Sequence, residues 1–199
     1  MILFKYKSIE GSTDKTFSNT FIRDCTALLN NEIWFSTLDK LNDPYEGVFK
    51  INENDIKAVA IFNKKADINE LKRAKNNLVN ILKQNSGILS MTTDNQNLLM
   101  WSHYTNNQKG YSLQYEIKTD DFIKFDGKFF NPKLMHLRKV TYSDNFPTIS
   151  AIENDHHKFV TYKGKCWVYE KEYRFISQAA GLYTYKQECL KVIFFRCYV

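Results

Sequence analysis

The sequence has no pair of cysteines at C-x-x-C spacing, although it contains four cysteines, at positions 25, 166, 189 and 197. Zinc sites and small disulfide frameworks need characteristic cysteine spacings, so we expect reduced thiols instead. The N-terminus has no signal-peptide core, because Lys5 interrupts its apolar run. No uncharged apolar run reaches the length of about 18 residues that suggests a membrane span. We therefore expect a cytoplasmic protein with no membrane partner, formed by a single domain over residues 1–199.

The short motifs that identify common reactions are also missing. The chain has no P-loop, no G-x-G-x-x-G, no G-x-S-x-G and no H-E-x-x-H. Its charge is only moderately basic, with 28 Lys and Arg against 22 Asp and Glu, a net charge of +6. Such a charge permits an anionic partner such as nucleic acid or a phosphorylated cofactor. Scattered lysines are, however, more typical of a solvated surface.

The apolar pattern predicts a mixture of strands and helices without strict alternation. We expect strands over residues 2–6, 32–36, 88–92, 111–117, 137–142, 167–176 and 190–195. We expect helices over 21–29, 67–84 and 98–104, with a weaker helical pattern over 149–162. Asp67 is the expected N-cap of the second helix. This order predicts an α+β fold with a mixed or antiparallel β-sheet flanked by helices.

The expected strand over residues 167–176 carries the most informative polar pattern. Side chains alternate along a strand, so Glu170, Glu172 and Arg174 would share one face. Two carboxylates this close repel unless a cation such as Arg174 compensates them. One interpretation is an exposed, salt-bridged strand face of little energetic consequence. The other is a carboxylate that acts as a general acid or base, or that stabilises positive charge at a sugar carbon.

Two further segments contain polar or aromatic candidates. Trp101 and Tyr104 lie on one face of the expected short helix, a spacing more typical of a core than of a ligand platform. His103 beside them is a candidate acid or base, although such a histidine is more often structural. Asn42 and Asp43 precede a proline and suit a turn. They would line a site only if this loop meets the strand that carries Glu172.

Four sequence blocks, taken together, resemble the bacterial family known as domain of unknown function 2971. The blocks are residues 4–6, 32–46, 100–111 and 167–174, and they follow the order of the family across almost the whole chain. Members occur among bacterial accessory and defence genes, which implies a role in phage defence or in a toxin system. Residues 193–196 depart from the usual glycine-terminated apolar strand of the family, which implies a C-terminal strand that is shortened or missing.

A looser resemblance is to ADP-ribosyltransferases. These enzymes place a basic or imidazole residue on a first strand, a hydroxyl or aromatic residue on a second strand, and a glutamate, often within E-x-E, on a later strand. Here Lys5 or Tyr6, Ser36 and Glu170-x-Glu172 occur in that order. The resemblance implies that NAD is the substrate, that no metal is required and that the acceptor is a nucleic acid or a protein.

The resemblance also implies roles for individual residues. Glu172 would stabilise the oxocarbenium-like state formed when the nicotinamide bond breaks, and Glu170 would position or deprotonate the acceptor. Lys5 or Arg174 would hold the pyrophosphate, and Trp34 or Tyr45 would stack on nicotinamide. The expected binding set is Lys5, Tyr6, Ser36, Asn42, Asp43, Trp101, Tyr104 and Arg174.

Two other functions fit the sequence. The first is a metal-independent ribonuclease that uses His103, Glu172 and lysines clustered around a cleft. The second is a non-catalytic binding module, in which Glu170 and Glu172 would be exposed and far from Asn42 and Trp101.

Overall fold

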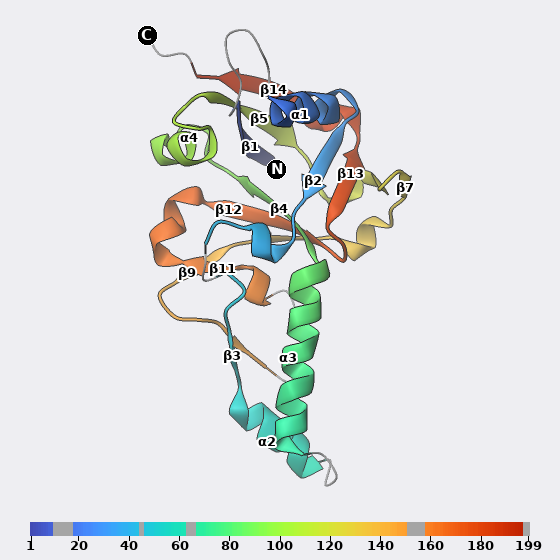
Figure 1. Cartoon of the computed structure of the whole chain (residues 1–199), viewed down its shortest axis with the longest axis vertical. Helices are drawn as coiled ribbons and strands as arrows, with labels where there is room; N and C mark the ends of the chain where they lie inside the picture. Colours follow the sequence, from blue (N-terminus) through green and yellow to red (C-terminus); the bar gives the residue numbers. More distant parts are fainter. Residues whose placement is uncertain (10–17, 44–45, 63–66, 151–157, 197–199) are drawn as a thin grey trace.

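The computed structural model describes residues 1–9, 18–43, 46–62, 67–150 and 158–196. Within these residues the fold combines two antiparallel sheets with four helices. Figure 1 shows their arrangement. The described helices are α1 (Asn19–Leu29), α2 (Glu53–Phe62), α3 (Ile68–Asn85) and α4 (Leu98–Tyr104). The predicted α+β class is confirmed. No helix within the described ranges is both long enough and apolar enough to cross a membrane.

The larger sheet has the strand order β14-β5-β1-β4-β12-β8. Its strands are β14 (Leu190–Phe195), β5 (Gly110–Glu116), β1 (Ile2–Ser8), β4 (Gly87–Thr92), β12 (Glu172–Ser177) and β8 (His136–Lys139). The second sheet has the order β2 (Glu32–Phe35), β13 (Gly181–Tyr185), β6 (Phe122–Phe125) and β7 (Lys128–Phe129). Two parallel pairs complete the described strands: β3 (Lys50–Ile51) with β10 (Thr148–Ile149), and β9 (Thr141–Ser143) with β11 (Tyr162–Gly164).

The main core lies between the two sheets. Leu89 and Phe175 of the larger sheet are buried with Phe35, Phe122 and Tyr183 of the smaller one, and several of these rings meet edge to face. Burial of one such side chain contributes roughly 1.5–3 kcal/mol. This packing fixes the ends of β2, β4 and β12 relative to one another.

The larger sheet opens between β1 and β4. Strand β1 pairs with β5 along seven residues, but its register with β4 consists of the single pair Phe4 and Thr92 in the described strands. Near the start of β4, Ser36 forms a bridge with Ile88, so the end of β2 also lies beside β4. The divergence of β1 from β4 therefore leaves room for side chains from three strands to face one another.

Helix α3 projects away from the sheets, and α2 packs against its far end (Figure 1). The predicted N-cap is confirmed, because the Asp67 carboxylate accepts hydrogen bonds from the backbone N–H groups of Asn69 and Glu70. Toward the sheets, Val79 of α3 is buried with Leu38, Ile88 and Ile176 in a second apolar cluster. The C-terminal part of α3 is thus tied to the fold, whereas its N-terminus depends on α2 and on its cap.

The prediction of a strand over residues 167–176 is confirmed only for its second half. Residues Lys165–Glu170 form a 3₁₀ helix, Lys171 has a left-handed φ of 46°, and β12 begins at Glu172. Distant side chains hold this turn: Thr92 donates a hydrogen bond to the carbonyl of Glu170, and Asn97 donates one to that of Tyr169. Glu170 therefore does not share a strand with Glu172 and Arg174.

The weak helical pattern over 149–162 gives no α-helix in its described part. Ile149 ends β10, residues Lys158–Val160 form a 3₁₀ turn, and Tyr162 begins β11. Residues 151–157 of that prediction lie outside the described residues. The strand expected over residues 190–195 is present as β14, hydrogen-bonded to β5 at the edge of the sheet.

Candidate functional site

A cleft of about 230 Å³ lies where β1 and β4 diverge, and we call it the central cleft. Strands β1 and β4, the segment after β2, helix α4, β11 and β12 all contribute to its walls. Its lining residues are Phe4, Lys5, Tyr6, Ser36, Lys40, Leu41, Asn42, Glu46, Ser90, Met91, Thr92, Met100, Tyr104, Lys163 and Glu172. The cleft mixes apolar walls with a few converging polar groups, as small-molecule sites commonly do.

The structure brings most of the sequence-predicted residues to this cleft. Those that line it directly are Lys5, Tyr6, Ser36, Asn42, Tyr104 and Glu172. Asn42 and Glu172, which are 130 positions apart in the chain, therefore face the same space. The other four predicted residues do not line the cleft but lie next to residues that do: Asp43, Trp101, Glu170 and Arg174.

These four residues support the lining residues. Asp43 accepts a hydrogen bond at 3.0 Å from the backbone N–H of Gly164, next to Lys163. Trp101 is buried with its ring edge-to-face against Tyr6, at a centroid distance of 5.1 Å. The expectation that Trp101 is a core residue is therefore confirmed.

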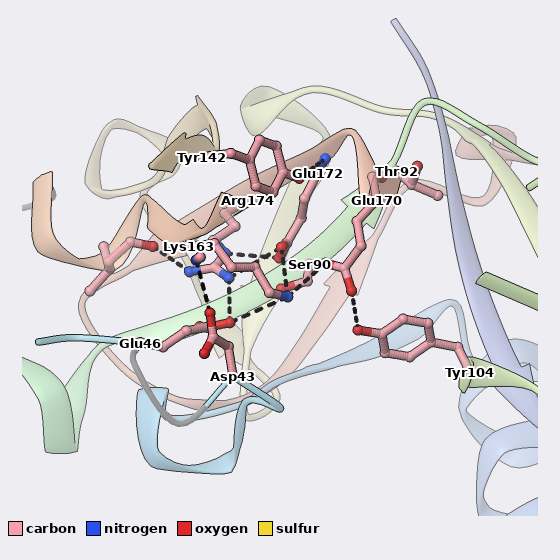
Figure 2. Close-up of polar contacts among 12 residues, drawn as sticks. Asp43, Glu46, Ser90, Thr92, Tyr104, Tyr142, Lys163, Glu170, Glu172 and Arg174 are labelled. Atoms are coloured by element: carbon pink, nitrogen blue, oxygen red, sulfur yellow. Dashed lines mark hydrogen bonds and ion pairs between the residues drawn. The ribbon is translucent and has the colours of Figure 1, made fainter. Parts of the chain in front are cut away.

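Arg174 holds the Glu172 carboxylate from behind (Figure 2). Its Nε and Nη2 atoms donate to the two carboxylate oxygens at 2.8 and 3.2 Å, and its Nη1 donates to the carbonyl of Val160 at 2.6 Å. The Nη2 atom also lies 2.9 Å from Glu46 Oε1. Bidentate contacts of this kind fix both the position and the orientation of a carboxylate. Arg174 is fully buried and does not line the cleft, so it orients Glu172 rather than facing a substrate phosphate.

Lys163 of β11 connects three glutamates from three segments. Its Nζ lies 2.6 Å from Glu170 Oε2 and 3.4 Å from both Glu172 Oε2 and Glu46 Oε1. All four side chains are almost completely buried. The interpretation of Glu170 and Glu172 as an exposed salt-bridged face is thus wrong, because both glutamates are buried and both contact the buried Lys163 of β11.

The surroundings give the three glutamates different pKa values. Burial disfavours the charge on Glu172, but Arg174 and Lys163 outweigh that effect and hold its pKa at about 2. For Glu170, burial outweighs the attraction of Lys163 and raises the pKa. Burial likewise raises the pKa of Glu46 despite Arg174 and Lys163. Glu172 is therefore a fixed negative charge, whereas Glu170 is better suited to hold or transfer a proton.

Tyr104 links Glu170 to the central cleft. Its hydroxyl donates a hydrogen bond to Glu170 Oε1 at 2.5 Å, and burial raises its pKa so that it stays protonated. Because Tyr104 lines the cleft and Glu170 lies behind it, a proton accepted from a molecule in the cleft can reach Glu170 through this hydroxyl.

Lys5 is the cation of the central cleft that has no ion-pair partner among the described residues. It donates a hydrogen bond to the carbonyl of Ser90 at 2.9 Å, across the divergence of β1 and β4. Burial, reinforced by the charge of Lys7, lowers its pKa to about 8. It is still protonated at neutral pH and can bind an anion.

Two other candidates from the sequence lie elsewhere. His103 is exposed, lies against Tyr169 with a ring-centroid distance of 6.2 Å, and does not line the central cleft. Trp34 lines a neighbouring pocket instead. Tyr45 lies outside the described residues.

Lys163 and Glu46 were not among the site residues predicted from the sequence, where residue 46 is only the end of the block 32–46. No pattern around Lys163 distinguishes it from the other lysines of the chain, and the segment before it was expected to be helical. The parallel pairing of β9 with β11 is what places it beneath Glu172. For Glu46 the available signal was its place at the end of the block 32–46, which also contains Asn42 and Asp43, although a glutamate after a turn is common at protein surfaces.

Residues 100–175 match the model of the family described as protein of unknown function (DUF2971). The matched stretch contains Tyr104, Lys163, Glu170, Glu172 and Arg174, whereas Lys5, Ser36 and Glu46 lie before it. No curated protein and no solved structure matches the chain. The resemblance to this family of unknown function is thus supported over the segment that supplies most of the buried charges of the central cleft.

Proposed function

We propose that the protein is an NAD-consuming ADP-ribosyltransferase-like enzyme whose active site is the central cleft. One observation carries this proposal: Lys5 and Tyr6 of the first strand, Ser36 at the end of the second, and Glu172 of a later strand line one cleft. This is the strand-by-strand order of basic or aromatic, hydroxyl and glutamate residues that the looser resemblance implied. A role in bacterial defence or in a toxin system follows from the family resemblance alone.

In the proposed reaction the bond between the ribose carbon and the nicotinamide nitrogen breaks, and nicotinamide leaves with the electron pair. The positive charge that develops on the ribose is stabilised by Glu172, which Arg174 and Lys163 keep ionised and oriented. An acceptor oxygen or nitrogen then bonds to the ribose carbon, and its proton passes to Glu170 through Tyr104. Lys5 holds a phosphate of the dinucleotide.

The alternatives receive less support from the geometry. A ribonuclease built on His103 and Glu172 needs both residues at one cleft, and His103 does not line it. A binding module was expected to expose Glu170 and Glu172 far from Asn42, yet both glutamates are buried and Glu172 shares the cleft with Asn42.

The direct test is to incubate the purified protein with NAD and with nucleic-acid or protein acceptors. We expect release of nicotinamide and a mass increase of one ADP-ribosyl group on the acceptor. Glu172→Gln should lower the rate by about 10²-fold or more, because the amide keeps the size of the side chain but cannot supply the charge. Glu170→Gln is the matched control, which should impair transfer to an acceptor while some hydrolysis of NAD persists.

The rates must be compared at a temperature at which thermal unfolding shows that each variant is folded. Glu172→Gln removes the carboxylate that Arg174 binds through two nitrogens, leaves it with Glu46, and is expected to destabilise the fold. A folded Glu172→Gln protein that releases nicotinamide at the unchanged rate would refute the proposal.

A further inference from the structure

A second pocket, of about 370 Å³, lies beside the central cleft under helix α1. It is bounded by α1, β1, β2 and β5, and we call it the Trp34 pocket after its most exposed aromatic residue. Lys5 and Ser36 line both this pocket and the central cleft. The two spaces therefore meet at the one cleft lysine that is free of ion pairs among the described residues.

Trp34 provides an aromatic face in this pocket. Alternation along β2 buries Ile33 and Phe35 in the core and turns Trp34 outward, where 59% of its surface is exposed. Leu182, its cross-strand partner on β13, also lines the pocket. An exposed indole at the wall of a concave pocket offers a stacking surface to a flat ligand.

The polar wall of the Trp34 pocket is weakly positive. Lys7 and Arg23 both pair with Asp24, at 3.0 and 3.1 Å, so that one carboxylate neutralises only one of the two cations. Glu32 adds a second negative charge and Lys5 a third positive one. This balance suits a ligand that combines a planar ring with an anionic phosphate.

We propose that the Trp34 pocket is a nucleotide subsite, in which the base stacks on Trp34 and the phosphate points toward Lys5. A dinucleotide can then extend from this pocket into the central cleft, with its two phosphates near the lysine that the two spaces share. The inference rests on the proposed function only for the identification of that dinucleotide as NAD. It reassigns Trp34 from the nicotinamide to the other base.

The test uses titration calorimetry with AMP, nicotinamide mononucleotide and NAD. We expect AMP to bind to the unmodified protein and Trp34→Ala to weaken this binding about 10- to 100-fold, whereas Trp34→Phe, which keeps a stacking face, should retain most of it. Phe129→Ala is the matched control, because Phe129 is an exposed aromatic residue on β7 of the same sheet that lines neither pocket. Nicotinamide mononucleotide should bind equally well to the protein with and without Trp34.

The outcomes separate this inference from the proposed function. If nicotinamide is released from NAD but Trp34→Ala changes neither the binding of AMP nor the KM for NAD, the nucleotide subsite is refuted and the enzyme proposal survives. If AMP binding depends on Trp34 but no condition releases nicotinamide, the subsite is supported and the proposed chemistry fails. Absence of AMP binding to the unmodified protein refutes the subsite in either case.

Discussion

At the scale of single residues, the balance of charge around Lys163 governs both the site and its stability. Burial raises the pKa values of Glu46 and Glu170 despite the neighbouring cations, whereas for Glu172 the cations Arg174 and Lys163 outweigh burial and lower the pKa. Removing one partner from such a group is costly, because it leaves uncompensated charge in a region with little water. The central cleft and the fold therefore depend on the same contacts.

We predict that Lys163→Met lowers the free energy of unfolding at neutral pH by roughly 3–5 kcal/mol. The control is Lys165→Met two residues later: Lys165 forms a surface ion pair with Asp144 in which both side chains are about 70% exposed, so its loss should cost less than about 1 kcal/mol. Urea unfolding of both variants measures the difference. Equal stabilities of the two variants would show that the buried contacts of Lys163 carry no net stability.

The loss of unfolding free energy caused by Lys163→Met should become smaller as the pH is lowered from 7 toward 5. The pKa values of Glu46 and Glu170 are already raised in the folded protein, and loss of the cation raises them further. A carboxyl group whose pKa is higher in the folded state binds more protons there, so its stabilising contribution is lost as the pH rises through that pKa and recovered as the pH falls. Unfolding curves at several pH values check this sign, and a deficit that grows on acidification would contradict it.

Lys5 should make ligand binding sensitive to alkaline pH. Its pKa of about 8 means that the ammonium, which binds a phosphate, is lost as the pH rises through that value. The affinity for AMP or NAD should therefore fall above pH 8, by up to about tenfold per unit. Lys5→Arg keeps its charge throughout and should give a flat profile in calorimetry between pH 7 and 9. A flat profile in the unmodified protein, or the same fall in Lys5→Arg, would exclude Lys5 as the anion-binding group.

The candidate site could be predicted from the sequence only where local chemistry was unusual. Asn42 and Glu172 lay in polar segments and Tyr104 on a short helix beside the candidate His103, and the fold brings Asn42, Tyr104 and Glu172 to one cleft. Lys163 gave no such signal, because a lysine becomes a buried ion-pair partner only through strand pairing that no local pattern encodes. Its role emerges from the β9–β11 contact and from the cover provided by the Glu46 loop.

At the scale of secondary-structure elements, helices α1, α3 and α4 were predicted close to their observed bounds, whereas α2 was missed. The bounds of α3 and α4 follow from the caps Asp67 and Asn97 and from apolar spacing, both of which are local. The run from Trp167 to Glu170 has strong strand propensity at its aromatic residues, yet it belongs to a 3₁₀ helix because Asn97 donates a hydrogen bond to the carbonyl of Tyr169 and Thr92 donates one to that of Glu170. Strand β13 was missed because its pairing with β2 and β6 is wholly non-local.

The N-cap of α3 offers an element-scale prediction. Asp67→Ala should cost about 0.5–2 kcal/mol, because the N–H groups of Asn69 and Glu70 lose their acceptor. Asp67→Ser, which restores an acceptor, should recover most of that loss. Hydrogen exchange of the first helical turn gives a local measure beside thermal unfolding. Unchanged exchange in Asp67→Ala would show that α2, rather than the cap, holds this end of the helix.

At the scale of the whole molecule, the central cleft is a composite of parts distant in the chain. The family match covers residues 100–175 and supplies α4, Lys163 and β12, while β1, β2 and the Glu46 loop come from outside it. The two contributions meet because the core between the sheets fixes β2 and β12 against β4. The charges of the cleft are also largely compensated internally: of its three lysines, Lys163 is engaged by glutamates and Lys40 pairs with Asp39, which leaves Lys5 without an ion pair among the described residues. Such a site suits a small anionic ligand better than a long polyanion.

Thermal unfolding with ligands tests this preference on the intact protein. NAD at about 100 times its Kd should stabilise the fold by about 2.7 kcal/mol, which for a chain of this size raises Tm by roughly 5–10 °C. The rise in Tm should survive in Glu172→Gln, because it reports binding rather than chemistry, and it should be much smaller in Lys5→Met.

The rise in Tm with NAD should also change little between about 50 and 200 mM salt, because one lysine–phosphate contact releases few counterions. Binding of an RNA oligonucleotide along a basic surface would instead weaken steeply over that range. If RNA raises Tm in this salt-dependent way and NAD does not, the nucleic-acid-directed alternative replaces the transferase proposal.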